Sequence, residues 1–72
     1  MTKEERDAFQ HAKHLHTRKQ YQEALHHLEA NISGDTNDSS VHYLQGQCWE
    51  GLGEYQMACE AYRGAYLSSL GW

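Results

Sequence analysis

The amino-acid sequence predicts an all-α protein that folds as a single domain of four helices. Its 72 residues are enough for one domain and no second one. Apolar residues recur at spacings of three and four along most of the chain, as they do on one face of a helix. No run alternates between apolar and polar residues for long enough to form a strand. An internal repeat of 34 residues groups the four helices into two pairs.

The first helix is predicted to begin after Thr2, because Thr2 and Glu5 have the spacing of a capping box. Its apolar face carries Ala8, Ala12 and Leu15. Basic residues gather near its carboxyl end, where the helix dipole favours positive charge.

The second helix is predicted to run from Tyr21 to Ile32, with Gly34 as a left-handed stop just beyond it. The apolar residues of this helix are Tyr21, Ala24, Leu25, Leu28 and Ile32. Residues 33–40 (SGDTNDSS) are dense in turn-forming residues and are predicted to link the two helix pairs.

The third helix is predicted to begin near Ser39 or Ser40, either of which could serve as its N-cap. Glycines within residues 51–53 are expected to mark its end. The apolar stripe of this helix comprises Val41, Leu44, Cys48, Trp49 and Leu52.

The fourth helix is predicted to run from Tyr55 to about Ser69. Its apolar stripe comprises Tyr55, Ala58, Cys59, Tyr62 and Tyr66. Cys48 and Cys59 fall on the inner stripes of two antiparallel helices. We expect both to be small buried hydrophobic residues that approach one another.

The repeat gives the four helices a specific arrangement. The segment Tyr21–Ala24 recurs as Tyr55–Ala58, 34 residues later. The pattern in the second half consists of Gly46, Trp49, Gly53, Glu54, Tyr55, Ala58, Tyr62 and Ala65. This pattern resembles that of the tetratricopeptide repeat family, and with the weaker first half the resemblance covers essentially the whole chain.

The resemblance implies two helix-turn-helix repeats within one domain of residues 1–72. The first repeat spans about residues 5–38 and the second about residues 39–72. Their four antiparallel helices would form a fragment of a right-handed α-solenoid. Because one hairpin cannot bury its apolar face alone, the two hairpins are expected to share a core.

Composition and charge exclude several classes of protein. The formal net charge is −4, with only six Lys and Arg residues, so nucleic acid is not an expected partner. No apolar run approaches the roughly 18 residues of a membrane span, and the charged start, MTKEERD, does not look like a secretory signal. We therefore expect a cytoplasmic protein. No nucleophile–base pair or glycine-rich phosphate loop is present, so neither an enzyme nor a cofactor is expected.

The resemblance further implies a protein–protein interaction module, either a small adaptor or a chaperone-like subunit. In this family the first helices of successive repeats line a concave groove that binds a peptide or a helix. Phe9 and Tyr43 would supply aromatic contact area there, and Arg6 and Lys13 positive charge. The alternative is that Phe9 and Tyr43 complete a small core. By helical phase, the residues facing the groove are Arg6, Phe9, Lys13, His16, Ser40, Tyr43, Gln47 and Glu50.

A second hypothesis is a structural subunit that self-assembles and has no groove ligand. Two repeats are fewer than the roughly three that such arrays need for stability, and no polar capping helix is expected after Tyr66. A seam on the fourth helix would form a two-fold homodimer, and Gly64 within it suggests close approach of another backbone. The residues predicted to self-associate are Met57, Ala61, Gly64, Ala65, Ser68, Leu70 and Trp72.

A histidine-based metal carrier is the third hypothesis, since the chain contains six histidines. His11 and His14 are three residues apart on one predicted helix, which is a workable spacing for two ligands. Neither CxxC nor HExxH occurs in the chain. We therefore expect no bound metal, and polar surface or half-buried positions for the histidines.

Overall fold

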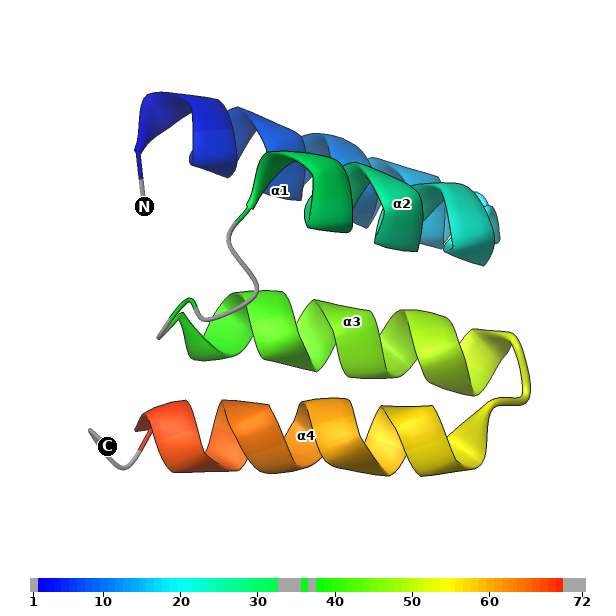
Figure 1. Cartoon of the computed structure of the whole chain (residues 1–72). Coiled ribbons are helices and arrows are strands. Elements are labelled where there is room, and N and C mark those ends of the chain that lie inside the picture. The colour runs from blue at the N-terminus through cyan, green and yellow to red at the C-terminus, as the bar shows by residue number, and fades with distance from the viewer. Residues whose placement is uncertain (1, 33–35, 37, 70–72) are drawn as a thin grey trace.

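The computed structural model describes residues 2–32, 36 and 38–69, with the side chains of residues 68 and 69 excepted. Four helices follow one another: α1 (Lys3–Thr17), α2 (Tyr21–Asn31), α3 (Ser39–Gly51) and α4 (Tyr55–Ser69). Figure 1 shows that α1 and α2 form one antiparallel hairpin, stacked on a second hairpin of α3 and α4. The predicted all-α fold of two helical hairpins is confirmed.

The start of α1 is the predicted capping box. The hydroxyl oxygen of Thr2 accepts a hydrogen bond from the backbone N–H of Glu5 at 3.2 Å. The Glu5 carboxylate accepts one from the backbone N–H of Thr2 at 3.0 Å. Both bonds satisfy donors that a helix end would otherwise leave without partners.

The start of α3 differs from the prediction, because its N-cap is Asp38 rather than Ser39 or Ser40. The Asp38 carboxylate accepts a hydrogen bond from the backbone N–H of Ser40 at 2.9 Å. A carboxylate also interacts favourably with the positive end of the helix dipole. Both serines are therefore inside the helix. The expected stop at Gly34 lies outside the described residues, and α2 ends at Asn31, with Ile32 extended.

The turns inside the two hairpins have the same geometry. In the first, Lys19 has a φ of +64°, and the N–H of Gln20 donates to the carbonyl of Leu15 at 2.9 Å. In the second, Gly53 has a φ of +80°, and the N–H of Glu54 donates to the carbonyl of Trp49, also at 2.9 Å. These residues are equivalent at an offset of 34, so the sequence repeat is a repeat of backbone structure.

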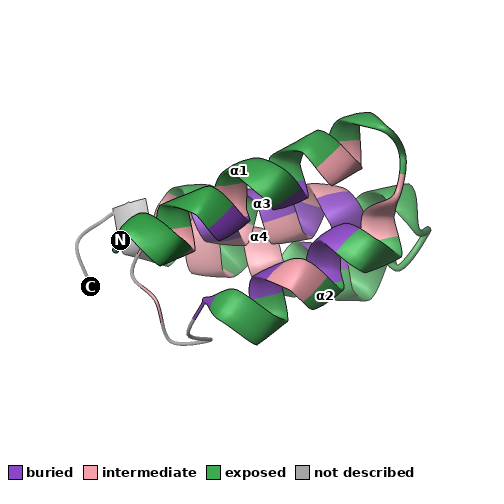
Figure 2. Ribbon diagram, turned by 90° about the horizontal axis from the view of Figure 1, so that it is seen from above, coloured by how far each residue is buried: buried purple, intermediate pink, exposed green. Residues whose placement is uncertain are grey.

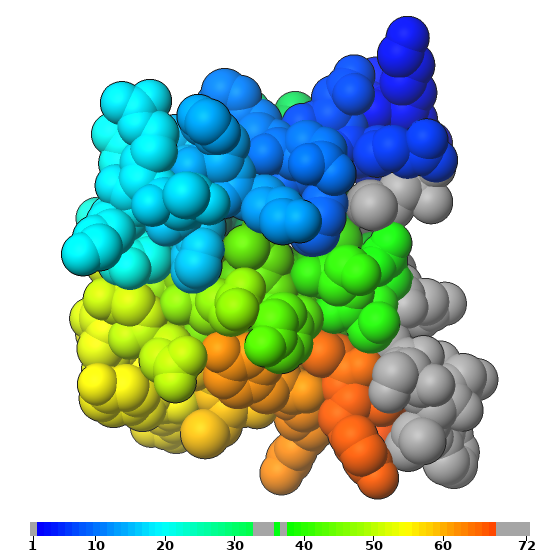
Figure 3. All heavy atoms as spheres, turned by 180° about the vertical axis from the view of Figure 1, so that it is seen from behind, coloured from blue at the N-terminus to red at the C-terminus, as the bar shows by residue number. Residues whose placement is uncertain are grey.

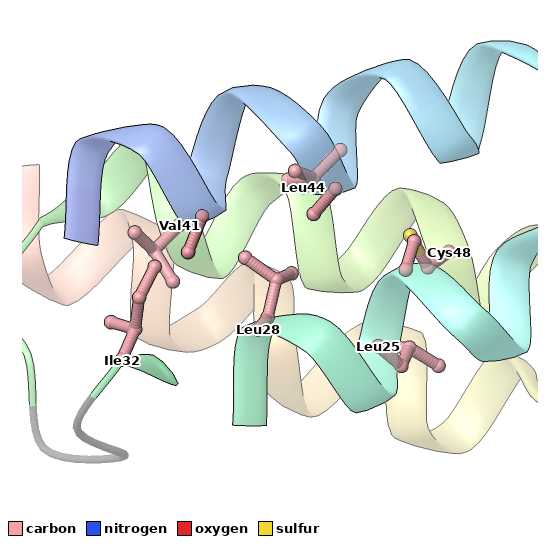
Figure 4. Close-up of a cluster of buried hydrophobic side chains, with 9 residues drawn as sticks. Leu25, Leu28, Ile32, Val41, Leu44 and Cys48 are labelled. Atoms are coloured by element: carbon pink, nitrogen blue, oxygen red, sulfur yellow. The ribbon is translucent and has the colours of Figure 1, made fainter. Parts of the chain in front are cut away.

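The hydrophobic core lies between the hairpins and uses three helices. Figure 2 shows the buried residues on the sides of the helices that face one another, and Figure 4 shows the side chains between α2 and α3. Phe9, Leu15, Tyr21 and Trp49 are half-buried against this cluster. The buried residues of the core cluster are Ala8, Ala12, Ala24, Leu25, Leu28, Ile32, Val41, Leu44 and Cys48.

The apolar stripe predicted for α4 is mostly not buried. Ala58 is buried, but Tyr55 and Tyr66 are 66% and 64% exposed. Cys48 is buried and Cys59 is exposed, so the expectation that both cysteines are buried is wrong for Cys59. The physical reason is that, within the described part of the chain, α4 packs against α3 and against no other helix.

Candidate functional site

A groove of about 450 Å³ lies between the first helices of the two hairpins, α1 and α3. Figure 3 looks onto this side of the molecule, with α1 in blue above α3 in green. The groove is formed because α3 packs against both α1 and α2, which leaves the opposite sides of α1 and α3 open. Its lining residues are Phe9, Lys13, His16, Thr17, Ser40, Tyr43, Leu44 and Gln47.

The structure brings most of the residues predicted by helical phase together at this groove. Arg6 and Glu50 do not line it and are exposed elsewhere on the same two helices. Phe9 packs against the core, whereas Tyr43 is 55% exposed. The predicted residues that do line the groove are Phe9, Lys13, His16, Ser40, Tyr43 and Gln47.

The charge along the groove is positive, although the chain as a whole has a formal net charge of −4. Lys13 and His16 are its basic lining residues, and none of its lining residues is Asp or Glu. His16 also packs edge-on against the ring of Tyr21, with ring centroids 5.3 Å apart. The groove therefore favours a ligand that brings acidic groups to its α1 side.

The Tyr43 side chain is held in place from α4. Its ring lies against that of Tyr62, with ring centroids 5.6 Å apart and planes at 50°. The Tyr62 hydroxyl donates a hydrogen bond to the Glu50 carboxylate at 3.1 Å. Glu50, predicted to face the groove, thus positions Tyr62 and through it Tyr43. An aromatic residue whose ring is already held loses little conformational entropy on binding a partner.

A second pocket of about 560 Å³ continues the groove toward α4. It shares Ser40 and Tyr43 with the groove. Its remaining lining residues are Ser39, Tyr62, Ala65 and Tyr66. Analysis of the sequence missed Tyr62 and Tyr66 as residues of this surface, because their spacing placed them on a core stripe. The sequence did contain a signal for this surface: the second repeat has aromatic residues where the first repeat has Leu28 and Ile32.

The residues predicted to self-associate do not form one exposed seam. Met57 is 40% exposed, while Ala61, Gly64 and Ala65 are half-buried. A Cβ atom built on Gly64 would lie 3.2 Å from Nδ1 of His42. The close approach inferred at Gly64 is therefore to α3 of the same chain. Leu70 and Trp72 lie outside the described residues, as does the side chain of Ser68.

The histidines interact with their neighbours. The rings of His11 and His27 lie against each other, with centroids 4.4 Å apart. Nε2 of His42 is 2.8 Å from the carbonyl oxygen of Thr36, within hydrogen-bonding distance. Among the residues that the structure describes, no three or more His, Cys, Asp or Glu side chains are grouped so that they could hold a metal ion.

Over those same residues, no helix has the length and apolar character needed to cross a membrane.

Two neighbouring groups of α3 and α4 hold their protons more tightly than usual. Burial raises the pKa of the Cys48 thiol from its ordinary value of 9.0 to about 11. Burial, followed by the hydrogen bond to Glu50 and the charge of that carboxylate, raises the pKa of Tyr62 from 10.0 to about 12. Both groups therefore stay neutral to a higher pH in the folded chain than in the unfolded chain.

These pKa values predict a loss of stability in alkali. The unfolded chain releases the Cys48 proton near pH 9.0 and the Tyr62 proton near pH 10.0, while the folded chain keeps both to about pH 11 and about 12. The contribution of these two groups to the free energy of unfolding should thus be fully present well below pH 9.0 and fall as the pH rises through this window. Urea unfolding at successive pH values measures how the free energy of unfolding depends on pH. Cys48→Ala should remove the part of the fall in the free energy of unfolding that begins near pH 9.0. An unchanged fall in that variant would contradict the raised pKa of the thiol.

Comparison with known proteins places the chain in a family. No curated protein and no solved structure matches it. The family model for the anaphase-promoting complex, cyclosome, subunit 3, matches residues 1–65, which is most of the chain. The matched region contains α1, α2, α3 and most of α4, and so both helical hairpins. The chain is therefore a tetratricopeptide-like repeat protein that belongs to the family of anaphase-promoting complex, cyclosome, subunit 3.

Proposed function

We propose that the chain is a non-catalytic protein-interaction module that binds an extended segment or a helix of another protein in the groove between α1 and α3. The observation that carries this proposal is the position of Tyr43. It is 55% exposed in the groove, and its ring is held against Tyr62. Exposed aromatic rings that are already ordered are typical anchors of protein interfaces.

The family supports a partner that is itself a protein. Its name is that of a subunit of a complex, the anaphase-promoting complex or cyclosome. A subunit of such a complex contacts other subunits or the proteins they bind, which supports a protein as the ligand of this chain. The positive charge of the groove indicates which side chains the ligand carries. An acidic side chain would pair with Lys13, and an apolar one would pack against Phe9 and Tyr43.

The test compares two exposed tyrosines, one inside the groove and one outside it. Tyr43→Ala should weaken binding by about 1–3 kcal/mol, which is about fivefold to 150-fold in Kd, because it removes the anchor. Tyr55→Ala, on a 66% exposed tyrosine of α4, is the matched control and should leave binding unchanged. Displayed peptide libraries selected on the wild-type protein supply the ligands, and titration against each variant measures Kd.

Two outcomes would contradict the proposal. Equal losses for Tyr43→Ala and Tyr55→Ala would show that the ligand does not bind in the groove. If Tyr43→Ala unfolds the chain and Tyr43→Phe restores it, Tyr43 belongs to the core, which is the alternative that the sequence left open. Helical circular dichroism of each variant distinguishes the second outcome from a loss of binding.

A self-assembling subunit is the second candidate function, and the two-fold homodimer stays a prediction. The observation that favours assembly is the number of large apolar side chains that α4 exposes: Tyr55, Met57, Tyr66 and Leu67. A dimer that buries them would raise the unfolding temperature with protein concentration, whereas a monomer with a groove ligand would not. Sedimentation equilibrium separates the two candidates directly.

A further inference from the structure

The pocket between the start of α3 and the later part of α4 is lined by three tyrosines. Its volume of about 560 Å³ is within the range of pockets that bind small ligands. Figure 3 shows the start of α3 in green directly above α4 in orange on this side of the molecule. Among the described residues that line the pocket, none is Asp, Glu, Lys, Arg or His. The lining residues are Tyr43, Tyr62, Tyr66, Ser39, Ser40 and Ala65.

The tyrosine side chains come from two helices and surround one space. The rings of Tyr43 and Tyr62 are inclined to each other, with centroids 5.6 Å apart and planes at 50°. Tyr62 and Tyr66 are four residues apart on α4, so their side chains lie on the same side of that helix. Several aromatic rings around one space are the arrangement by which proteins recognise quaternary ammonium groups.

Two carboxylates are hydrogen-bonded to residues that line the pocket. Glu50 accepts a hydrogen bond from the Tyr62 hydroxyl at 3.1 Å, and Asp38 accepts one from the backbone N–H of Ser40 at 2.9 Å. Because Asp38 already occupies the positive end of the α3 dipole, that helix end does not favour an anionic ligand. The faces of the aromatic rings are themselves negative. A cation is therefore complementary to this pocket, whereas the groove beside it favours an acidic group.

The hydrogen-bonding groups of the pocket indicate which kind of cation it favours. The ammonium group of lysine and the guanidinium group of arginine both carry several N–H donors. In this pocket the side-chain acceptors are hydroxyl groups, and no carboxylate is among the described lining residues, so those donors would lose part of their hydration without a strong acceptor. A quaternary ammonium group has no N–H donor and contacts the ring faces through its methyl groups.

We propose that the pocket formed by Tyr43, Tyr62 and Tyr66 binds the trimethylammonium group of a trimethylated lysine on a partner protein. The pocket shares Ser40 and Tyr43 with the α1–α3 groove, so a segment bound in the groove can place one side chain in the pocket. In this respect the inference rests on the proposed function, to which it adds a modification of the partner. Such a segment carries an acidic side chain near Lys13 and the trimethyllysine beside α4.

The probe that tests this inference is trimethyllysine alone, with an acetylated amino group and a methylamide in place of its carboxylate. It is titrated into the full chain, and the nuclear magnetic resonance signals of the tyrosine rings give its Kd. The two comparison probes are the same compound with unmethylated lysine and the neutral isostere in which carbon replaces the quaternary nitrogen. We expect the Kd of trimethyllysine to be about fivefold to thirtyfold lower than that of either, because the others lack the methyl groups or the charge.

Substitutions at Tyr66 test which part of the side chain binds. Tyr66→Ala should abolish the preference for trimethyllysine, whereas Tyr66→Phe should keep it, because the ring and not the hydroxyl contacts the cation. Tyr66 is 64% exposed, so neither substitution should unfold the chain, and circular dichroism checks this. Tyr55→Ala, on an exposed tyrosine of α4 outside the pocket, is the matched control and should leave the Kd unchanged.

Several outcomes would overturn the inference. Equal binding of the neutral isostere would show that the pocket selects apolar bulk alone, and equal binding of lysine would show that it selects charge alone. Equal losses for Tyr66→Ala and Tyr55→Ala, or no change in the ring signals with any probe, would also contradict it. So would a Kd that rises with protein concentration, because a second copy would then cover the pocket. The probe is a single amino acid and Tyr66 does not line the α1–α3 groove, so this result and that of the Tyr43→Ala test with peptides are independent.

Discussion

Leu28→Ala is expected to lower the free energy of unfolding by about 2–5 kcal/mol. Leu28 is fully buried at the centre of the core that the two hairpins share. The substitution removes apolar contacts with both hairpins and leaves a cavity that the surrounding helices fill only in part. A domain of this size has a total stability of only about 4–10 kcal/mol. The substitution should therefore remove a large fraction of the total stability, and urea unfolding at 25 °C followed by circular dichroism measures the loss.

The control for this variant is the same chemical change on the surface. Leu67 is 43% exposed on α4, so Leu67→Ala should cost less than about 1 kcal/mol. Equal losses for the two variants would mean that the hairpins do not share a core around Leu28. In that case the packing of α3 on α2 would also be wrong.

Backbone features set by short-range patterns could be predicted from the sequence. The capping box at Thr2 and the approximate bounds of the helices follow from local residue preferences, and the structure has them. Lys19 is the exception, since a left-handed φ of +64° favours glycine rather than lysine. Its equivalence to Gly53 at an offset of 34 is the one signal for this turn. The repeat carries information there that the residue type does not.

Burial on α4 could not be predicted, because periodicity shows that a helix has an apolar side but not what covers that side. Leu25 and Cys59 have equivalent places in the repeat, yet one is buried and the other is exposed. The difference lies in the next helix, which is present after α2 and is not among the described residues after α4. The spacing of the apolar residues on the fourth helix was predicted correctly, but the burial of that face was not.

At the candidate groove, periodicity likewise predicts the face on which a residue lies but not the contacts that its side chain makes. Helical phase places Phe9, Lys13 and Tyr43 on one side of the molecule, as the structure does. Phase does not show which side chains bind one another, so the hydrogen bond between Glu50 and Tyr62 was not foreseen. That bond changes the expected position of Glu50 from the groove to the support behind it.

Gly46→Ala is expected to destabilise the chain, although the same change in most helices is stabilising. Gly46 lies inside α3, where alanine would normally gain about 1 kcal/mol over glycine. Here a Cβ atom would lie 2.5 Å from Cε1 of the Tyr62 ring, so the ring would have to move. Its contact with Tyr43 and its hydrogen bond to Glu50 oppose that movement. We expect a net loss of about 1–3 kcal/mol in urea unfolding.

A double-mutant cycle isolates the contact responsible. In a Tyr62→Ala background the ring is absent, so Gly46→Ala should become neutral or stabilising by about 1 kcal/mol. Gly64→Ala is the control on α4, where the added Cβ would lie 3.2 Å from the His42 ring and needs a smaller adjustment. If Gly46→Ala stabilised the chain in both backgrounds, Tyr62 would not pack on Gly46. Tyr43 would then lack the contact with α4 that holds it in the groove. The cycle therefore tests two things together: the packing between α3 and α4, and the preorganisation of the binding surface.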